Sequence, residues 1–191
     1  VDHTSKSQTI FHDLQEHFGF VGGSEQDYIK YLRRTDIPSN MWLYVPMVKV
    51  KAFAGLSCLS KKDPSKQRKL LMSCATNYIC CDVRRRAEHG LHGGEALANL
   101  HVPSDNLAVA AFDESNAFSF IQILMWMSMW MVAPPVRAEA VWDLLSPELR
   151  GSLNASELVG PAYRRLAMGC SHSVHIIMNI NVTHVGWCLF N

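Results

Sequence analysis

An acidic residue at the end of an apolar segment is the first feature of this sequence that could support chemistry. Residues 106–114 read NLAVAAFDE, a pattern typical of a strand buried on both faces, and the acidic pair begins at Asp113. Asp113 has two structural interpretations, as a helix N-cap or as a salt-bridge partner. It also has a chemical one, because a carboxylate on a rigid strand is a suitable ligand for a divalent cation.

Positive charge is the second such feature, and it is concentrated in the middle of the chain. Residues 49–86 contain ten Lys or Arg and two Asp, a local net charge of +8, although the whole 191-residue chain has a net charge of only +1. A local excess of this kind is typical of a surface that faces phosphates, and its structural alternative is a solvated turn. The run KKDPSKQRK at 61–69 lies between two apolar segments, which predicts a β-hairpin with Lys and Arg at its tip.

Three segments, in this order, resemble the fingers and palm of reverse transcriptases. KKDPSKQRKLLMSCATNY at 61–78 resembles the fingers hairpin, and FDESNAF at 112–118 resembles the first catalytic motif of the palm. YRRLAMGCSHS at 163–173 resembles the turn through Gly into a helix that lines the template and nucleotide pocket. Each motif alone is weak, and the signal comes from their order and spacing.

The resemblance implies a role for several side chains. Asp113 would be a catalytic ligand of Mg²⁺, and Lys61 and Arg68 would hold the triphosphate of the incoming nucleotide. Phe118 would lie under the sugar and exclude a 2′-hydroxyl, which favours deoxynucleotides. The residues implied beside the base and sugar are Met168 and Gly169, and those implied along the nucleic acid are Lys62, Lys66, Lys69 and Ser171.

The sequence also departs from the family pattern. Met72 and Cys74 occupy positions where the family usually has Asp and Arg, although Asn77 fits, and Ala167 replaces a customary Pro. The hairpin with the remaining catalytic Asp pair has no match up to Asn191. We therefore expect no polymerase activity from this chain alone, with the missing carboxylates supplied by a downstream polymerase segment or a partner chain.

The segments that must position these residues alternate along the chain between the hydrophobic periodicity of helices and that of strands. We expect an α+β fold, the fingers-palm portion of a right-hand polymerase, with an antiparallel palm sheet packed against helices. Residues 1–43 would form an N-terminal helical segment and residues 44–191 the fingers and palm. The predicted helices are 8–20, 24–35, 137–153 with a break at Ser146-Pro147, and 171–190; the predicted strands are 44–53, 55–62, 69–78, 106–114 and 162–169.

Several residue classes limit the compartment and the partners. The six cysteines form no regular framework and the first residues are polar, which indicates reduced thiols in an intracellular protein, cytoplasmic or nuclear. The apolar run 117–133 contains Ser119, Gln122 and Ser128, so it predicts a buried or partner-facing segment and not a membrane span. A zinc site is not expected, because Cys80 and Cys81 are adjacent and lack the usual spacer.

The expected partners are a nucleic acid template-primer and nucleoside triphosphates. Two alternatives stay open at this point. The chain could be a non-enzymatic nucleic-acid-binding remnant that uses the basic block 49–86, or a protein-interaction module that docks through its Met/Trp run at 125–131.

Overall fold

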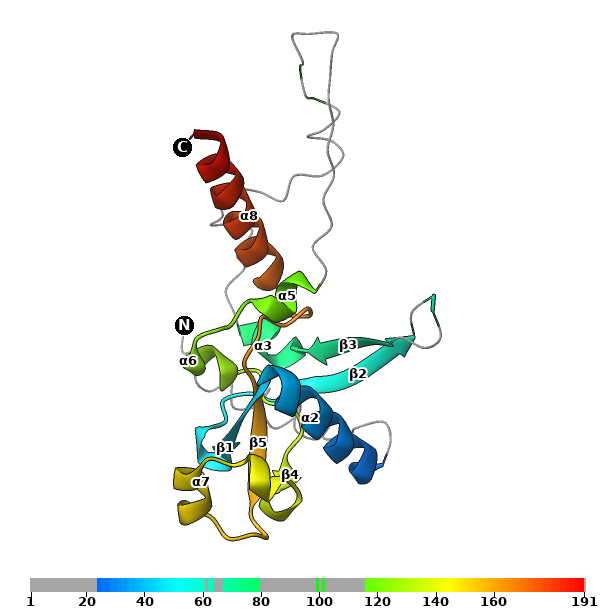
Figure 1. Cartoon of the computed structure of the whole chain (residues 1–191), viewed down its shortest axis with the longest axis vertical. Helices are drawn as coiled ribbons and strands as arrows, with labels where there is room; N and C mark the ends of the chain where they lie inside the picture. The colour runs from blue at the N-terminus through cyan, green and yellow to red at the C-terminus, as the bar shows by residue number, and fades with distance from the viewer. Residues whose placement is uncertain are drawn as a thin grey trace.

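The computed structural model describes residues 24–60, 62–63, 67–79, 99, 101 and 116–190. Helices and strands alternate irregularly along these residues (Figure 1). The helices are α2 (Glu25–Ser39), α3 (Cys74–Ile79), α5 (Ala117–Phe120), α6 (Met125–Ser128), α7 (Pro147–Ser152) and α8 (Ser173–Phe190), with 3₁₀ turns η1 (Met47–Lys49) and η3 (Ala138–Leu144). The strands are β1 (Trp42–Pro46), β2 (Gly55–Ser60), β3 (Gln67–Met72), β4 (Val136–Arg137) and β5 (Leu158–Tyr163).

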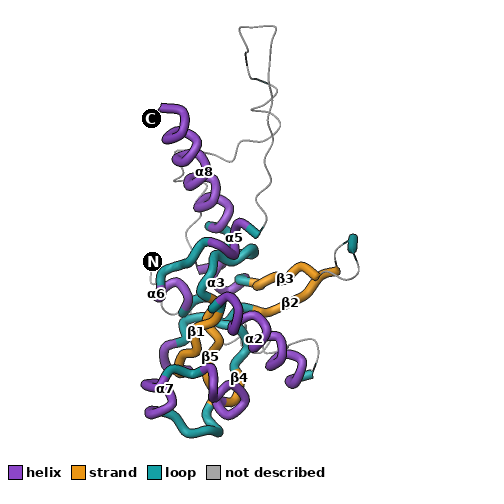
Figure 2. Tube along the Cα trace, viewed as in Figure 1, coloured by secondary structure: helices purple, strands orange, loops and turns teal. Residues whose placement is uncertain are grey.

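The strands form two small antiparallel sheets, which confirms the α+β class. One sheet has the order β1-β5-β4, with Trp42 opposite Tyr163 and Val136 opposite Val159. The other is the hairpin β2–β3, whose register pairs Gly55 with Met72. Figure 2 shows the hairpin projecting away from the three-stranded sheet.

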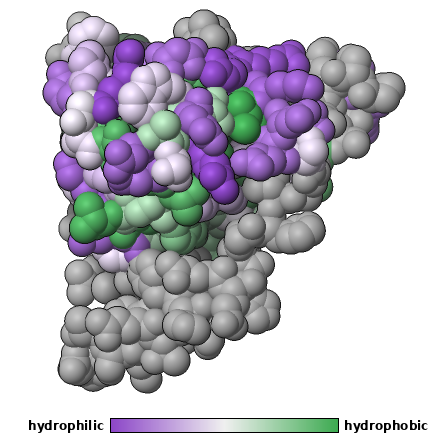
Figure 3. Space-filling model, turned by 90° about the horizontal axis from the view of Figure 1, so that it is seen from below, coloured by the Kyte–Doolittle hydropathy of each residue, from purple (hydrophilic) through white to green (hydrophobic). Residues whose placement is uncertain are grey.

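The core lies between α2, the three-stranded sheet and the η3 segment. Leu32 of α2, Val141 of η3 and Val159 of β5 are almost fully buried there. The rings of Trp42 and Tyr163 pack with their centroids 5.2 Å apart. In the face seen from below, hydrophilic residues cover most of the described surface, with smaller apolar patches between them (Figure 3).

An ion pair joins α2 to η3 at the surface. Both terminal nitrogens of Arg33 donate to the carboxylate of Asp143 at 2.7 Å, and Nη2 also donates to the Ala140 carbonyl at 3.0 Å. This hydrogen bonding to Arg33 holds the pKa of Asp143 below its ordinary value. The pair therefore contributes stability while Asp143 is ionised.

Local signals placed several elements correctly. Ser24 is the N-cap of α2 and accepts from the Asp27 amide at 3.1 Å, which confirms the predicted start of that helix. Ser146 likewise accepts from the Leu149 amide at 3.2 Å and begins α7, which confirms the predicted break before Pro147. The hairpin and the C-terminal helix are also confirmed, the helix beginning at Ser173.

Other boundaries were predicted wrongly. The strand predicted at 44–53 is β1, which starts earlier and ends at Pro46, because proline has no N–H to donate to a continuing ladder. The second hairpin strand ends at Met72, and residues 74–79 are helical as α3. The strand predicted at 162–169 is β5, which lies earlier, at 158–163.

The apolar run 117–133 is interrupted twice. It forms the short helices α5 and α6, which are separated by an isolated β-bridge between Gln122 and Arg165. After α6, Val132 forms isolated β-bridges with Phe53 and Ala162. None of the helices in the described part of the chain has the length and apolar character needed to cross a membrane. The predicted helix 8–20 and the predicted strand 106–114 lie outside the described residues.

Candidate functional site

The end of strand β3 and the turn at residues 167–173 are in very close contact, although they are distant in sequence. A Cβ built on Gly169 would lie 2.2 Å from the Leu71 carbonyl oxygen and 3.8 Å from the Ser73 nitrogen. Real Cβ atoms essentially never come within 3.0 Å of another heavy atom. Only glycine therefore lets these two stretches of backbone approach each other in this way.

The side-chain amide of Asn77 fastens the same turn. Its Nδ2 donates to the Gly169 carbonyl at 2.7 Å, and its Oδ1 accepts from the Ser171 amide at 2.8 Å. Asn77 belongs to α3, which follows β3 after a single residue. The turn is therefore held by hydrogen bonds to the segment that continues the hairpin.

Hydroxyl groups complete the attachment of these segments. Ser173, at the start of α8, is buried and donates to the Ala167 carbonyl at 2.6 Å, which closes the turn on itself. Thr76 of α3 is buried too and donates to the Trp130 carbonyl, which joins α3 to the segment after α6. Side-chain hydrogen bonds thus connect α3, the 167–173 turn and the 124–133 region into one unit.

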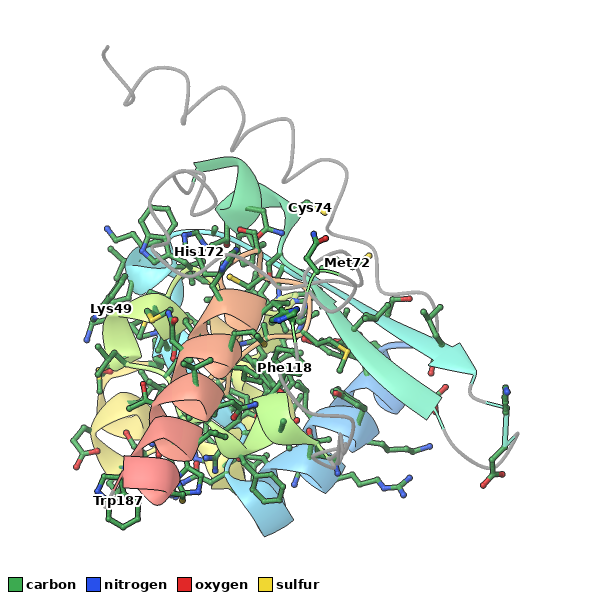
Figure 4. All side chains as sticks on the ribbon, turned by 90° about the horizontal axis from the view of Figure 1, so that it is seen from above. Lys49, Met72, Cys74, Phe118, His172 and Trp187 are labelled. Atoms are coloured by element: carbon green, nitrogen blue, oxygen red, sulfur yellow. The ribbon has the colours of Figure 1, made fainter. Side chains whose placement is uncertain are left out.

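Phe118 lies close to this unit. It is half-buried in α5 and packs against the main core. Figure 4 shows Phe118 between α8 and the hairpin, on the side of α8 where Met72 also lies. The helix α5 begins after Asn116, which has a positive φ of 57° and so redirects the chain immediately before Phe118.

The structure brings together only some of the predicted site residues. Gly169 is exposed beside Asn77, and Met168 and Ser171 are exposed on the same turn, with the Ser171 hydroxyl 3.3 Å from Nδ1 of His172. Arg68 and Lys69 are strand positions of β3, opposite Leu59 and Cys58. Lys62 is exposed beyond the end of β2, and the other predicted residues, Asp113, Lys61 and Lys66, lie outside the described residues.

Two exposed side chains at the end of β3 and the start of α3 are uncharged. Met72 and Cys74, which stand where the resemblance leads one to expect Asp and Arg, are both exposed. No group of three or more His, Cys, Asp or Glu side chains in the described part of the chain could hold a metal ion. The cysteines at 74, 170 and 188 are free, and Cys80 and Cys81 lie outside the described residues.

Asn77 is the residue whose importance the sequence did not reveal. It fits the family pattern after the hairpin, but a strand was predicted over its position, and nothing in the local sequence indicated its bonds to residues 169 and 171. Placing the Asn77 side chain beside the turn would have required a helix to be predicted for CATNYI, which forms α3. Comparisons of the chain with protein-family models, with curated proteins and with solved structures found no match.

Proposed function

We propose that this chain is the fingers-palm portion of a reverse transcriptase-like polymerase. In the intact enzyme it would transfer deoxynucleotides from their triphosphates to a primer 3′-hydroxyl on an RNA or DNA template. The observation that carries this proposal is the double hydrogen bond of Asn77 to the Gly169 turn. It joins the segment after the hairpin to the glycine turn, two of the three family-like motifs, across more than ninety residues of sequence.

The proposed nucleotide would lie against the exposed backbone of this turn. The side of Gly169 where a Cβ would lie is taken up by the β3 backbone, so the base and sugar would approach the remaining backbone of this exposed residue. Phe118 would then contact the sugar and exclude a 2′-hydroxyl. Arg68 and Lys61 of the hairpin would bind the triphosphate, because guanidinium and ammonium groups form charge-assisted hydrogen bonds with phosphate oxygens.

Magnesium would activate the primer hydroxyl and stabilise the leaving pyrophosphate. The described residues do not by themselves fit such a site, since they contain no carboxylate cluster. Asp113 would supply one ligand, and two neighbouring cations require several carboxylates to offset their repulsion. We therefore propose that a further polymerase segment or a partner chain completes the centre and that residues 1–191 alone are inactive.

Nucleotide selectivity tests the proposal directly. We would measure binding of dTTP and of 5-methyluridine triphosphate, which differ only in the 2′-hydroxyl, in the presence of Mg²⁺ by competition with a fluorescent deoxynucleotide, for the wild type and for Phe118→Val. The smaller side chain opens space beside the sugar, so the preference for dTTP should fall. Phe120→Val is the matched control, because Phe120 lies in the same short helix but is 77% exposed.

Two results would contradict the nucleotide site. One is the absence of nucleotide binding by the wild type at millimolar concentration. The other is an unchanged dTTP preference in a Phe118→Val protein that circular dichroism shows to be folded. A wild type that binds both nucleotides equally would remove the assigned role of Phe118.

A second candidate function is nucleic-acid binding without chemistry. The exposed, uncharged residues Met72 and Cys74 favour it, because they replace the charged pair that the family uses after its hairpin. Such a protein would bind labelled single-stranded or hybrid oligonucleotides with an affinity that falls as salt rises, and without nucleotide selectivity. Binding that is independent of salt would contradict both candidates.

A further inference from the structure

A second surface, away from the Gly169 turn, combines an exposed aromatic ring with positive charge. Trp126 in α6 is 63% exposed, and its neighbour Met125 is similarly exposed. The segment after α6 is hydrogen-bonded to the segment after β1, because Met129 accepts from the amides of Lys51 and Ala52 at 2.8 and 3.3 Å. These bonds fix α6 beside the η1 turn.

The charged side chains on the two segments that carry Trp126 and the η1 turn are basic. Lys49 and Lys51 are both exposed, and Figure 4 shows Lys49 next to α6. No Asp or Glu occurs at residues 37–62 or 115–138, the two stretches of sequence that contain this surface. These two segments therefore contribute positive charge with no carboxylate of their own, which favours a polyanionic ligand.

We propose that Trp126, Lys49 and Lys51 bind single-stranded nucleic acid, with a base stacked on the indole and the two ammonium groups on neighbouring phosphates. We call these three residues the Trp126 surface. Stacking platforms beside cationic side chains are the common way to hold single strands without reading their sequence. The inference deepens the proposed function, on which it rests for the nucleic-acid partner, by assigning a contact that none of the three motifs contains.

A nucleic acid suits this surface better than a protein partner does. Lysine is depleted at the centres of protein–protein interfaces, whereas here two exposed lysines lie on the segment that is hydrogen-bonded to the end of α6, the helix of Trp126. The Lys side chains reach phosphates as point charges on long flexible stems. An apolar protein partner would have to bury both ammonium groups or leave them at the rim.

The experiment measures binding of a fluorescein-labelled oligodeoxythymidine to the full chain by anisotropy. Trp126→Ala should weaken binding by roughly 5- to 150-fold, the range expected for loss of one base–aromatic stack. Trp187→Ala is the matched control, because Trp187 is 64% exposed but lies in α8. Since both rings are exposed, neither variant should fail to fold, and Trp126→Phe should keep much of the affinity.

A salt titration tests the lysines separately. Lys49→Gln combined with Lys51→Gln should lower the slope of log affinity against log salt by about 1.4, because each phosphate contact to a single strand contributes about 0.7. Arg34→Gln combined with Arg137→Gln removes the same charge at exposed positions outside the Trp126 surface, and should leave that slope nearly unchanged.

The outcomes separate this inference from the proposed function. Equal effects of Trp126→Ala and Trp187→Ala would overturn the Trp126 surface, whatever the nucleotide assay shows. The Trp126 surface would also be overturned if Trp126→Ala left oligonucleotide binding unchanged but abolished a dimer that the wild type forms in sedimentation. That result would identify a protein-docking face. Loss of oligonucleotide binding in Trp126→Ala with intact dTTP preference is the expected result. If Trp126→Ala loses oligonucleotide binding and the wild type binds no nucleotide, the Trp126 surface is supported and the proposed nucleotide site is contradicted.

Discussion

Replacing Gly169 by alanine should destabilise the protein because its Cβ would overlap the backbone of strand β3. The new atom would lie 2.2 Å from the Leu71 carbonyl oxygen, well inside the 3.0 Å limit that real Cβ atoms respect. The obstacle is a main-chain atom in a paired strand, since Leu71 is opposite Leu56 in the hairpin. It cannot rotate away as the end of a flexible side chain could.

The cost has two parts. Overpacking of this kind costs about 1–3 kcal/mol when the backbone must shift. Moving the turn away from Leu71 also stretches the two hydrogen bonds of Asn77, each worth about 0.5–1.5 kcal/mol. We expect Gly169→Ala to lower the free energy of unfolding by about 2–4 kcal/mol, a large fraction of the stability of an ordinary domain.

Two other glycines provide controls within the same chain. A Cβ on Gly151 in α7, or on Gly186 in α8, would meet nothing within 4 Å apart from the adjoining backbone of its own helix. Alanine is a better helix former than glycine, so Gly151→Ala and Gly186→Ala should each raise stability by about 0.5–1 kcal/mol. The same substitution is thus expected to have opposite signs at positions 151 and 169.

Urea unfolding followed by circular dichroism and by tryptophan fluorescence measures the differences. The two probes should give coincident transitions if unfolding is two-state. A Gly169→Ala protein within about 0.5 kcal/mol of the wild type, the range of ordinary surface substitutions, would refute the close contact between the turn and β3.

Two further predictions concern side-chain bonds. Asn77→Ala removes both hydrogen bonds to the 169–171 turn, so it should lower the free energy of unfolding by about 1–3 kcal/mol. Its effect should not add to that of Gly169→Ala in a double-mutant cycle, and full additivity would show that the two changes act independently. The pKa of Asp143 is lowered in the folded state by hydrogen bonding to Arg33, from an ordinary value of 3.8. The resulting stability is present above that value and lost as pH falls through the lower folded pKa, so Asp143→Asn should reduce the acid dependence of unfolding by up to about 1 kcal/mol. An unchanged acid slope in Asp143→Asn would rule out this contribution.

Sequence reasoning succeeded where the determinant is local. Ser24 and Ser146 precede helices and carry side chains that can cap them, and both do so. The charged turn between two apolar runs predicted the hairpin for a similar reason, since its residues favour reversal of the chain. In each case the deciding contacts lie within a few residues of one another.

It failed where the determinant is distant in sequence. The run CATNYI can form a strand or a helix, and its helical form is fastened by bonds from Thr76 to Trp130 and from Asn77 to the 169–171 turn. After Arg164, which still bonds to Met41 next to β1, the chain changes partner: Arg165 forms an isolated bridge with Gln122, and the Leu166 amide bonds to Ile121. No periodicity within 162–169 encodes those partners.

The same distinction applies to the candidate site. The family-like motifs identify residue types, but the site depends on which segments of the chain meet. The side-chain amide of Asn77 holds two of these segments together. Asn77 has a donor and an acceptor that match the Gly169 carbonyl and the Ser171 amide, a pattern that aspartate cannot reproduce because it lacks the donor. Gly169 then allows the approach that those bonds require. An enzyme that closes a charged hairpin over a nucleotide would need the hairpin's base to be fixed to the surface on which the nucleotide rests. Under the proposed function the Asn77–Gly169 contact would meet that need, because it joins the continuation of β3 to the exposed turn, while the hairpin beyond it projects from the body of the protein.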